Sequence, residues 1–445
     1  MNRLITNNEL LSFRENFNSI NKNQIAQNAV FENGIMDSAK NVKSIVNNTH
    51  QYSIDVKTGD ITNQKQSGRC WMFAALNVMR LEIMEKLNLE TFELSQAYPF
   101  FYDKLEKTNH FLENIIETIN LDLDSREVAF LLTDPLGDGG QWDMFASLID
   151  KYGVVPKSDM PESFSSSQSR YMDKLLTAKL REFACILRDD FSQNNDINNL
   201  RILKKEMLNT IYRMLSICLG EPPTTINFEI RNKNNDFIRD SKITPLDFYN
   251  KYVDMKMSDY VSIINAPTKD KPYNNTYTVK FLGSVQGGYP IKYLNLPIDE
   301  LKELAIKQMS DGKAVWFGSD VGQSSNKETG IMALDIYNFN NLFSTEFSLS
   351  KAQRLDYGES LMTHAMVLSG VNIDDNGKPN RWKVENSWGD KHGNKGYFVM
   401  SDDWFNEFTY QVVINKKYLS DEQKENFKKN PILLKPWDPM GSLAL

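Results

Sequence analysis

The sequence predicts an α+β fold in which a helical first half faces a mostly antiparallel sheet, with a cleft where the halves meet. Three observations support this. Residues 70–87 form an apolar helical run, helical patterns dominate as far as about residue 258, and short strand-like runs follow. No internal repeat is found.

The first half opens with an amphipathic pattern that predicts a short helix over residues 7–20. Residues 21–60 are polar and rich in Asn without strong periodicity, so we expect an extended segment lying across the body. The run at 70–87 is apolar nearly all round, which is typical of a helix buried in the middle of a domain.

A further helical region is predicted over residues 92–132, and a helix resumes at 142–152 after a loop rich in Gly and Asp. The composition then changes at about residue 158. The Ser-rich run 163–169 predicts a flexible joint, and two long helical patterns follow it. We interpret residues 158–258 as an insertion.

The second half is predicted to be a sheet with one intervening helix at 298–310. The expected strands are 260–264, 277–282, 314–318, 365–371, 381–385, 397–400 and 410–414. Four segments result: an N-terminal arm with the helical half (1–157), the helical insertion (158–258), the β-rich half (259–435) and a C-terminal arm (436–445).

Composition narrows the class of protein. A net charge of −7 argues against general nucleic-acid binding, although a locally basic surface stays possible. Three cysteines in 445 residues form no disulfide framework, which fits a reducing compartment, and we interpret Cys185 and Cys218 as packing residues. The N-terminus lacks a signal-peptide pattern and no apolar run spans a membrane. We therefore expect a soluble, cytoplasmic protein with no membrane partner.

Cys70 stands at the start of the apolar helix, after the stretch NQKQSGR. A thiol that attacks an acyl carbon needs a base, donors for the oxyanion and a helix N-terminus that favours the thiolate. Ser67 and Gly68 suit the turn before the helix, and the Gln64 amide can direct an N–H at the oxyanion beside that of Cys70. Alone, such a Cys is more often a small buried hydrophobe, so a His and an orienting amide are required elsewhere.

Both occur in the second half. His364 begins an apolar strand, and Asn386 and Trp388 lie in the motif VENSWGD. The Asn oxygen can accept a hydrogen bond from one ring nitrogen of His364, which leaves the other nitrogen to face the sulfur, and Trp388 can exclude water from this contact. Taken singly, His364 is more simply interpreted as a structural residue, and the VENSWGD motif as a hairpin with a core Trp.

The loop DPLGDGGQWDM contains the pair Gly139 and Gly140, for which two accounts stay open. Glycine can supply positive φ, or the pair can let a peptide backbone approach closely. Local sequence favours the first account.

The four candidate side chains follow one another along the chain in the order Gln64, Cys70, His364 and Asn386. This order resembles the papain-like cysteine peptidases, and most closely their intracellular branch, aminopeptidase C and bleomycin hydrolase. Further motifs are similar to that branch over essentially the whole chain: QKQSGRCW, GGQWDM, THAMVLSGV, RWKVENSWGDK, GYFVMSDDWF and PWDPMG. Secreted relatives usually carry a disulfide Cys where this chain has Ser67.

The resemblance implies a papain-like fold and a role for each residue. Cys70 would be the nucleophile, His364 the base that then protonates the leaving amine, and Asn386 its orienting partner. Gln64 and the Cys70 N–H would form the oxyanion hole, with Trp388 in support. The glycine pair matches the position that binds substrate backbone.

The C-terminal arm alone reads as a frayed end. The resemblance instead implies an arm in the cleft whose carboxylate meets the substrate's α-ammonium, so Ala444 and Leu445 are predicted substrate-binding residues. Ser442 replaces a common Ala, and Leu445 extends one residue beyond many relatives. Trimming of Leu445 on maturation would change which residue carries the working carboxylate.

The predicted function is a cysteine aminopeptidase that acts on peptides through a thioester acyl-enzyme and needs neither metal nor cofactor. The resemblance also implies a homohexamer, built by the insertion, with active sites facing an internal cavity. Two alternatives stay open: an amidase or acyltransferase with the same triad, and a non-catalytic scaffold that binds peptide or nucleic acid.

Overall fold

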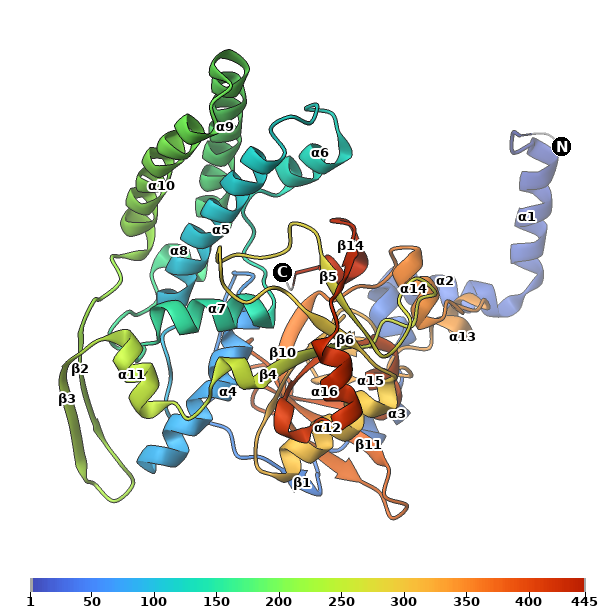
Figure 1. Ribbon diagram of the computed structural model, residues 1–445. Helices are drawn as coiled ribbons and strands as arrows, with labels where there is room; N and C mark the ends of the chain where they lie inside the picture. The colour runs from blue at the N-terminus through green and yellow to red at the C-terminus, as the bar shows by residue number, and fades with distance from the viewer. Residues whose placement is uncertain (1–2, 444–445) are drawn as a thin grey trace.

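The computed structural model describes residues 3–443, in which helices pack against one large sheet (Figure 1). Its strands are β1 (Ile54–Asp55), β4 (Tyr260–Ile264), β5 (Asn275–Val279), β6 (Tyr293–Asn295), β7 (Val315–Ser319), β8 (Ser325–Asn326), β9 (Ile331–Met332), β10 (His364–Ile373), β11 (Pro379–Glu385), β12 (Tyr397–Ser401), β13 (Thr409–Asn415) and β14 (Ile432–Leu434). They run in the order β14-β5-β6-β4-β13-β7-β10-β11-β12-β9-β8, and β1 pairs with β10. Among these described strands, only the pairs β14–β5, β4–β6 and β12–β9 are parallel. The α+β arrangement predicted from the sequence is confirmed.

The central strands read as apolar runs because both of their faces are covered. Strands β7 and β13 are buried along almost their whole length, and so is most of β10. Helix α12 (Ile298–Ser310), predicted at the same residues, packs against β13, β10 and β7. The remaining helices of this half are α13 (Phe339–Phe343), α14 (Lys351–Asp356), α15 (Asp402–Phe408) and α16 (Asp421–Lys428).

Helix α4 (Cys70–Leu87) packs against β10 and β7 and so joins the helical half to the sheet. Its apolar circumference explains this central place, since the first eleven of its residues are all buried. The indole N–H of Trp316 on β7 donates to the carbonyl oxygen of Trp71 at 2.9 Å. The N-terminal end of α4 is therefore fixed directly to the sheet.

The other helices of the first half are α5 (Ala97–Glu117), α6 (Arg126–Thr133) and α7 (Trp142–Tyr152). The helical region predicted at 92–132 thus divides into two helices, because turns interrupt it between residues 118 and 125. Helix α7 has the predicted bounds. In the described part of the chain, no helix combines the length and apolarity that crossing a membrane requires.

The segment 158–258 contains α8 (Phe164–Ser167), α9 (Arg170–Asn194), α10 (Ile197–Leu219), the hairpin β2 (Ile226–Arg231) and β3 (Phe237–Ile243), and α11 (Pro245–Tyr252). Helices α9 and α10 are the two predicted helical patterns, and both pack against α5 (Figure 1). The hairpin was not predicted. Strand β2 has alternating apolar residues, Ile226, Phe228 and Ile230, but β3 is polar at four of its seven positions and has no buried residue, so the second strand lacks an apolar stripe that would mark it. The boundaries of the insertion stay a prediction.

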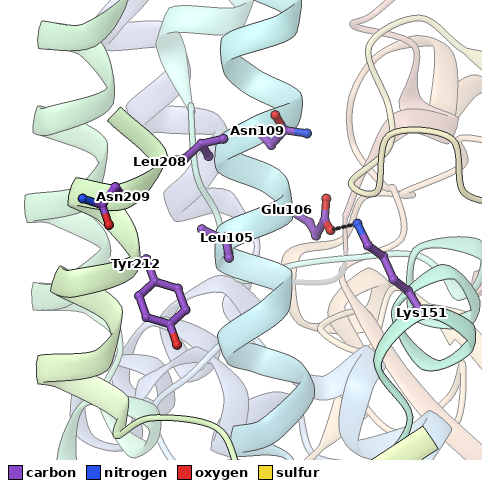
Figure 2. Close-up of a pocket in the computed structure, with 7 residues that line it drawn as sticks. All are labelled: Leu105, Glu106, Asn109, Lys151, Leu208, Asn209 and Tyr212. Carbon is purple, nitrogen blue, oxygen red and sulfur yellow. Dashed lines mark hydrogen bonds and ion pairs between the residues drawn. The ribbon is translucent and has the colours of Figure 1, made fainter. Parts of the chain in front are cut away.

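A pocket of about 420 Å³ lies where α5, α7 and α10 meet (Figure 2). Glu106 on α5 forms an ion pair with Lys151 on α7 at its edge, and Tyr212 on α10 faces it. None of the predicted site residues lines this pocket.

The extended course predicted for residues 21–60 is wrong over its first part. Helix α1 (Asn7–Ser19), which was predicted, is followed by α2 (Asn21–Ala39) and α3 (Val42–Asn47). Helix α2 has almost no segregation of apolar from polar side chains, and Ala39 is its one buried residue. Apolar periodicity cannot reveal a helix that has no buried face.

Two expectations within the insertion are also wrong. The Ser-rich run forms α8 in place of a flexible joint, because Ser163 and Ser166 make a reciprocal capping box and Ser166 is buried. Cys185 is exposed, and its thiol contacts the carboxylate of Asp189 instead of a packed core. Cys218 is half-buried.

Candidate active site

Cys70 is the first residue of α4, and its side chain is completely buried. The backbone N–H of Ala365, the second residue of β10, donates to Sγ at 3.5 Å. An 18-residue helix presents the positive end of its dipole at this position. The fold therefore places the thiol beside the start of β10, where a backbone N–H and the helix dipole both act to stabilise a thiolate against the opposing effect of burial.

His364 begins β10 and is oriented by Asn386. Its ring atom Nε2 lies 3.0 Å from the Asn386 side-chain oxygen Oδ1. The backbone N–H of Ser387 also donates to Oδ1, at 2.8 Å, which fixes the amide with its oxygen toward the imidazole. Nε2 is therefore the protonated nitrogen, and Nδ1 is left to serve the sulfur. The Trp388 ring packs on the imidazole with its centroid 4.9 Å away, as predicted for a cover over this contact.

Gln64 is tied to the same segment through Ser387. The Ser387 hydroxyl donates to the Gln64 oxygen Oε1 at 2.6 Å, and the Gln64 backbone N–H donates to the Ser387 carbonyl at 2.8 Å. The amide nitrogen of Gln64 donates to the Ser67 carbonyl oxygen at 2.7 Å. Because Nε2 carries two hydrogens, one stays available for an oxyanion beside the Cys70 N–H.

The electrostatics of the pair follow from burial. Burial raises the pKa of the Cys70 thiol to about 12, against the opposing effect of the Ala365 N–H. Burial also lowers the pKa of His364 to about 4, although its hydrogen bond with Asn386 acts in the opposite direction. A lone charge on either group is thus disfavoured. A thiolate and an imidazolium placed side by side compensate each other's charge, so proton transfer between such groups costs less free energy than ionising either one alone.

The glycine pair lies next to the residue that follows Cys70. A Cβ on Gly140 would meet the Trp71 ring at 2.4 Å, and neither Gly139 nor Gly140 has positive φ. The account based on positive φ is therefore wrong for this pair. Glycine is required at 140 because the loop backbone lies against Trp71, one residue beyond Cys70.

A buried charge cluster holds this loop and the turn before Cys70 together. Asp138 accepts from the Gly68 backbone N–H at 2.8 Å and forms an ion pair with Lys104 at 2.6 Å. Burial acts to raise the pKa of the Asp138 carboxyl, but Lys104 outweighs it and the net pKa is lowered. Lys107 donates to the Gly139 carbonyl at 2.6 Å. Asp138 is therefore ionised and positions the turn that precedes Cys70.

The chain after β14 enters the region between the glycine loop and His364. The Gln141 side-chain nitrogen donates to the Ser442 carbonyl at 2.7 Å, and the Ser442 hydroxyl donates to the Met362 carbonyl at 2.8 Å. Further back, the ammonium of Lys271 pairs with the Asp438 carboxylate at 2.9 Å. The last residues described thus bridge the two walls of the site. The predicted substrate-binding residues Ala444 and Leu445 lie outside the described residues.

Sequence reasoning missed three positioning groups, Ser387, Asp138 and Gln141. Each is adjacent to a residue that was singled out: Asn386, Gly139 and Gly140 respectively. Neighbours of candidate catalytic residues are a usable signal, because a polar side chain or backbone next to a reacting group often orients it. Their partners, however, come from distant segments and are not visible in the sequence.

The Peptidase C1-like family matches residues 4–441 of the chain. Aminopeptidase C of Listeria monocytogenes serovar 1/2a is 55% identical over 421 residues, which cover 95% of each chain. Aminopeptidase C of Streptococcus thermophilus is 52% identical over 418 residues, 94% of each chain. A crystal structure of pepw from Lactobacillus rhamnosis HN001 has a TM-score of 0.98 and 52% identity over 100% of both chains.

Proposed function

The chain belongs to the Peptidase C1-like family, has a papain-like fold and is a cysteine aminopeptidase, and we propose that Cys70 is its nucleophile. The single observation that carries this assignment is the continuous arrangement in which the Cys70 sulfur contacts the start of β10 while the His364 imidazole is held by Asn386.

In the first step, His364 takes the thiol proton and the Cys70 sulfur forms a bond to the carbonyl carbon of the first peptide bond. The carbonyl oxygen becomes an oxyanion, which accepts from the Cys70 N–H and the free hydrogen of Gln64 Nε2. The C–N bond then breaks, and the proton on His364 passes to the leaving amine. A thioester remains on the enzyme.

In the second step, His364 removes a proton from water, and the hydroxyl oxygen bonds to the thioester carbon. The C–S bond breaks as the second tetrahedral intermediate collapses, the thiolate recovers a proton, and the free amino acid leaves. Asn386 keeps the imidazole in one orientation through both transfers, so the same ring nitrogen serves as base and as acid.

The restriction to N-terminal residues is proposed to come from the C-terminal arm. Ser442 is held by Gln141 next to the glycine loop and by Met362 next to His364, which supports an arm that ends close to the site. A carboxylate at the end of this arm attracts the substrate's α-ammonium and blocks a longer chain from passing. This supports Ala444 or Leu445 as the carrier of the working carboxylate.

The assignment is tested by mass spectrometry of the products from one free and one N-acetylated peptide of the same sequence. We expect stepwise loss of N-terminal residues from the free peptide alone. Cys70→Ala should remove this activity without loss of helical circular dichroism, whereas Cys185→Ala, which changes an exposed thiol, should keep it. Internal cleavage of both peptides would contradict the proposed anchor, and activity in Cys70→Ala would contradict the nucleophile.

We further propose a cytoplasmic homohexamer acting on peptides. The three cysteines are free thiols, which supports a reducing compartment. Helix α1 buries none of its residues and projects from the body in Figure 1, which supports an assembled state that covers it. The same assembly would restrict the active sites to peptides and unfolded ends.

A further inference from the structure

A second pocket, of about 530 Å³, lies beside the proposed catalytic pair. Trp388 and Asn63 form one wall, and the lysines Lys65 and Lys327 lie at its lining. Trp388 connects the pocket to the chemistry, because its ring packs on His364 with a centroid distance of 4.9 Å. Asn63 pairs with Trp388 in a β-bridge and directly precedes Gln64.

The pocket and the C-terminal arm border different residues of the site. The arm reaches the site from the side of Gln141 and Met362, where it is held by Ser442. The pocket instead borders Gln64, through its neighbours Asn63 and Lys65, and Trp388. If the arm anchors the substrate's N-terminus, as the proposed function holds, the pocket receives the residue that follows the scissile bond.

The charged residues that line the pocket are all positive. Its lining contains two lysines and no carboxylate. Within residues 3–443, neither Lys65 nor Lys327 forms an ion pair. This contrasts with a chain whose net charge is −7. Two unneutralised cations in a concave surface concentrate positive potential there.

Both lysines are placed by local structure. The Lys327 ammonium lies 4.9 Å from the centroid of the Trp388 ring, over its face. Lys65 has φ of 55°, an unusual value for a residue with a side chain, and its backbone N–H donates to the Asn63 side-chain oxygen at 2.9 Å. Strained backbone of this kind is concentrated at binding and catalytic sites.

We propose that Lys65 and Lys327 form a specificity site for a carboxylate on the residue that follows the scissile bond. The carboxylate comes either from an acidic side chain or, in a dipeptide, from the terminal carboxyl group. Trp388 supplies the apolar wall against which the rest of that residue packs. This inference rests on the proposed function for its orientation.

The test compares matched substrates. One pair of C-terminally amidated tetrapeptides carries Glu or Gln at the second position, and one pair of dipeptides ends in a free acid or an amide. We expect kcat/KM three- to tenfold higher for the charged member of at least one pair at low ionic strength, since exposed ion pairs are weak and screened by salt. The preference should fall toward unity in Lys65→Gln/Lys327→Gln.

An aminoacyl arylamide, which has no carboxylate on its leaving side, serves as the reference substrate. Its kcat/KM should be unchanged in the double variant, which shows that the site is intact, and Lys378→Gln, an exposed change outside the pocket, should keep every preference. If the double variant loses the preference only among the tetrapeptides, the site binds an acidic side chain. If it loses the preference only among the dipeptides, the site binds the terminal carboxyl group. Equal ratios in wild type and double variant overturn the inference, whereas failure to cleave free peptides would refute the proposed function itself.

Discussion

At the scale of single residues, the proposed catalysis depends on two buried groups, Cys70 and His364, for each of which burial disfavours the charged form. Burial raises the pKa of Cys70 and lowers the pKa of His364, so each group alone is neutral at pH 7. The pair escapes this restriction because a thiolate and an imidazolium in contact compensate each other. The thiolate should therefore exist only while His364 is present to hold the proton.

We expect His364→Ala to slow alkylation of Cys70 by iodoacetamide at pH 6 by about two orders of magnitude or more, because the paired thiolate is replaced by a buried thiol. The alkylation profile should shift to higher pH, since removal of the proton acceptor leaves the effect of burial, which raises the pKa of the thiol. The measurement is the pH dependence of modification at Cys70, followed by peptide mapping. His50→Ala is the control, and a profile equal to that of wild type in His364→Ala would contradict the pairing.

At the scale of elements, the site is assembled by contacts between α4 and the sheet. Arg80, in the third turn of α4, forms an ion pair at 2.9 Å with Glu385, the last residue of β11 and the neighbour of Asn386. Both side chains are at most 1% exposed. Burial raises the pKa of Glu385 despite Arg80, so the carboxylate depends on its partner. The pair links the helix that begins at Cys70 to the strand that ends just before Asn386.

Arg80→Met should reduce the free energy of unfolding by about 3–5 kcal/mol, because it leaves a buried carboxylate without its counter-charge. Arg80→Met/Glu385→Leu should recover most of this loss, since a buried ion pair replaced by apolar groups is often tolerated. Urea unfolding of the single and double variants measures the loss of stability and its recovery. Lys383→Met, which breaks an exposed pair with Asp55, should cost less than about 1 kcal/mol. A single variant no less stable than this control would exclude the proposed link.

At the scale of the whole molecule, the N-terminal helix α1 is notable because it packs against no core of the described chain. Helix α1 has no buried residue, although its apolar side chains include Leu10, Leu11, Phe13 and Phe17, each at least 41% exposed. In Figure 1 the arm extends away from the sheet, with α2 joining it to the body near α13. Apolar helices on the surface of a monomer mark interaction sites, and a second copy of this chain is the partner expected in the proposed hexamer.

Removal of residues 2–19 should therefore yield a smaller assembly than the full-length chain, as measured by native mass spectrometry and light scattering. The helical half and the sheet should keep their cooperative unfolding, because α1 contributes nothing to the buried core. The matched control replaces exposed polar residues of α1 and leaves its apolar side chains in place. An unchanged mass for the shortened chain would contradict a role of α1 in assembly.

Several features of the fold were predictable because they depend on local patterns. Helix α4 was predicted with its observed bounds, since its apolar residues recur on nearly every side of a helix that follows the turn at Ser67 and Gly68. The strand that begins at His364 was predicted for the same reason. Helix α2 was missed, because a helix without a buried face has no periodic signal. The hairpin β2–β3 was missed for a related reason, since β3 has no buried residue and so gives no alternating signal beside that of β2.

For the site, the sequence by itself determined the types of group and their order along the chain: an amide, a thiol at a helix start, an imidazole and a second amide. Only the tertiary structure decided which atoms meet. Three contacts join segments far apart in the chain. They are the hydrogen bond between His364 Nε2 and Asn386, the hydrogen bond between Ser387 and Gln64, and the placing of Lys65 and Lys327 beside Trp388. The chemical character of a segment follows from its own residues, whereas contacts between distant segments form only when the two halves pack together.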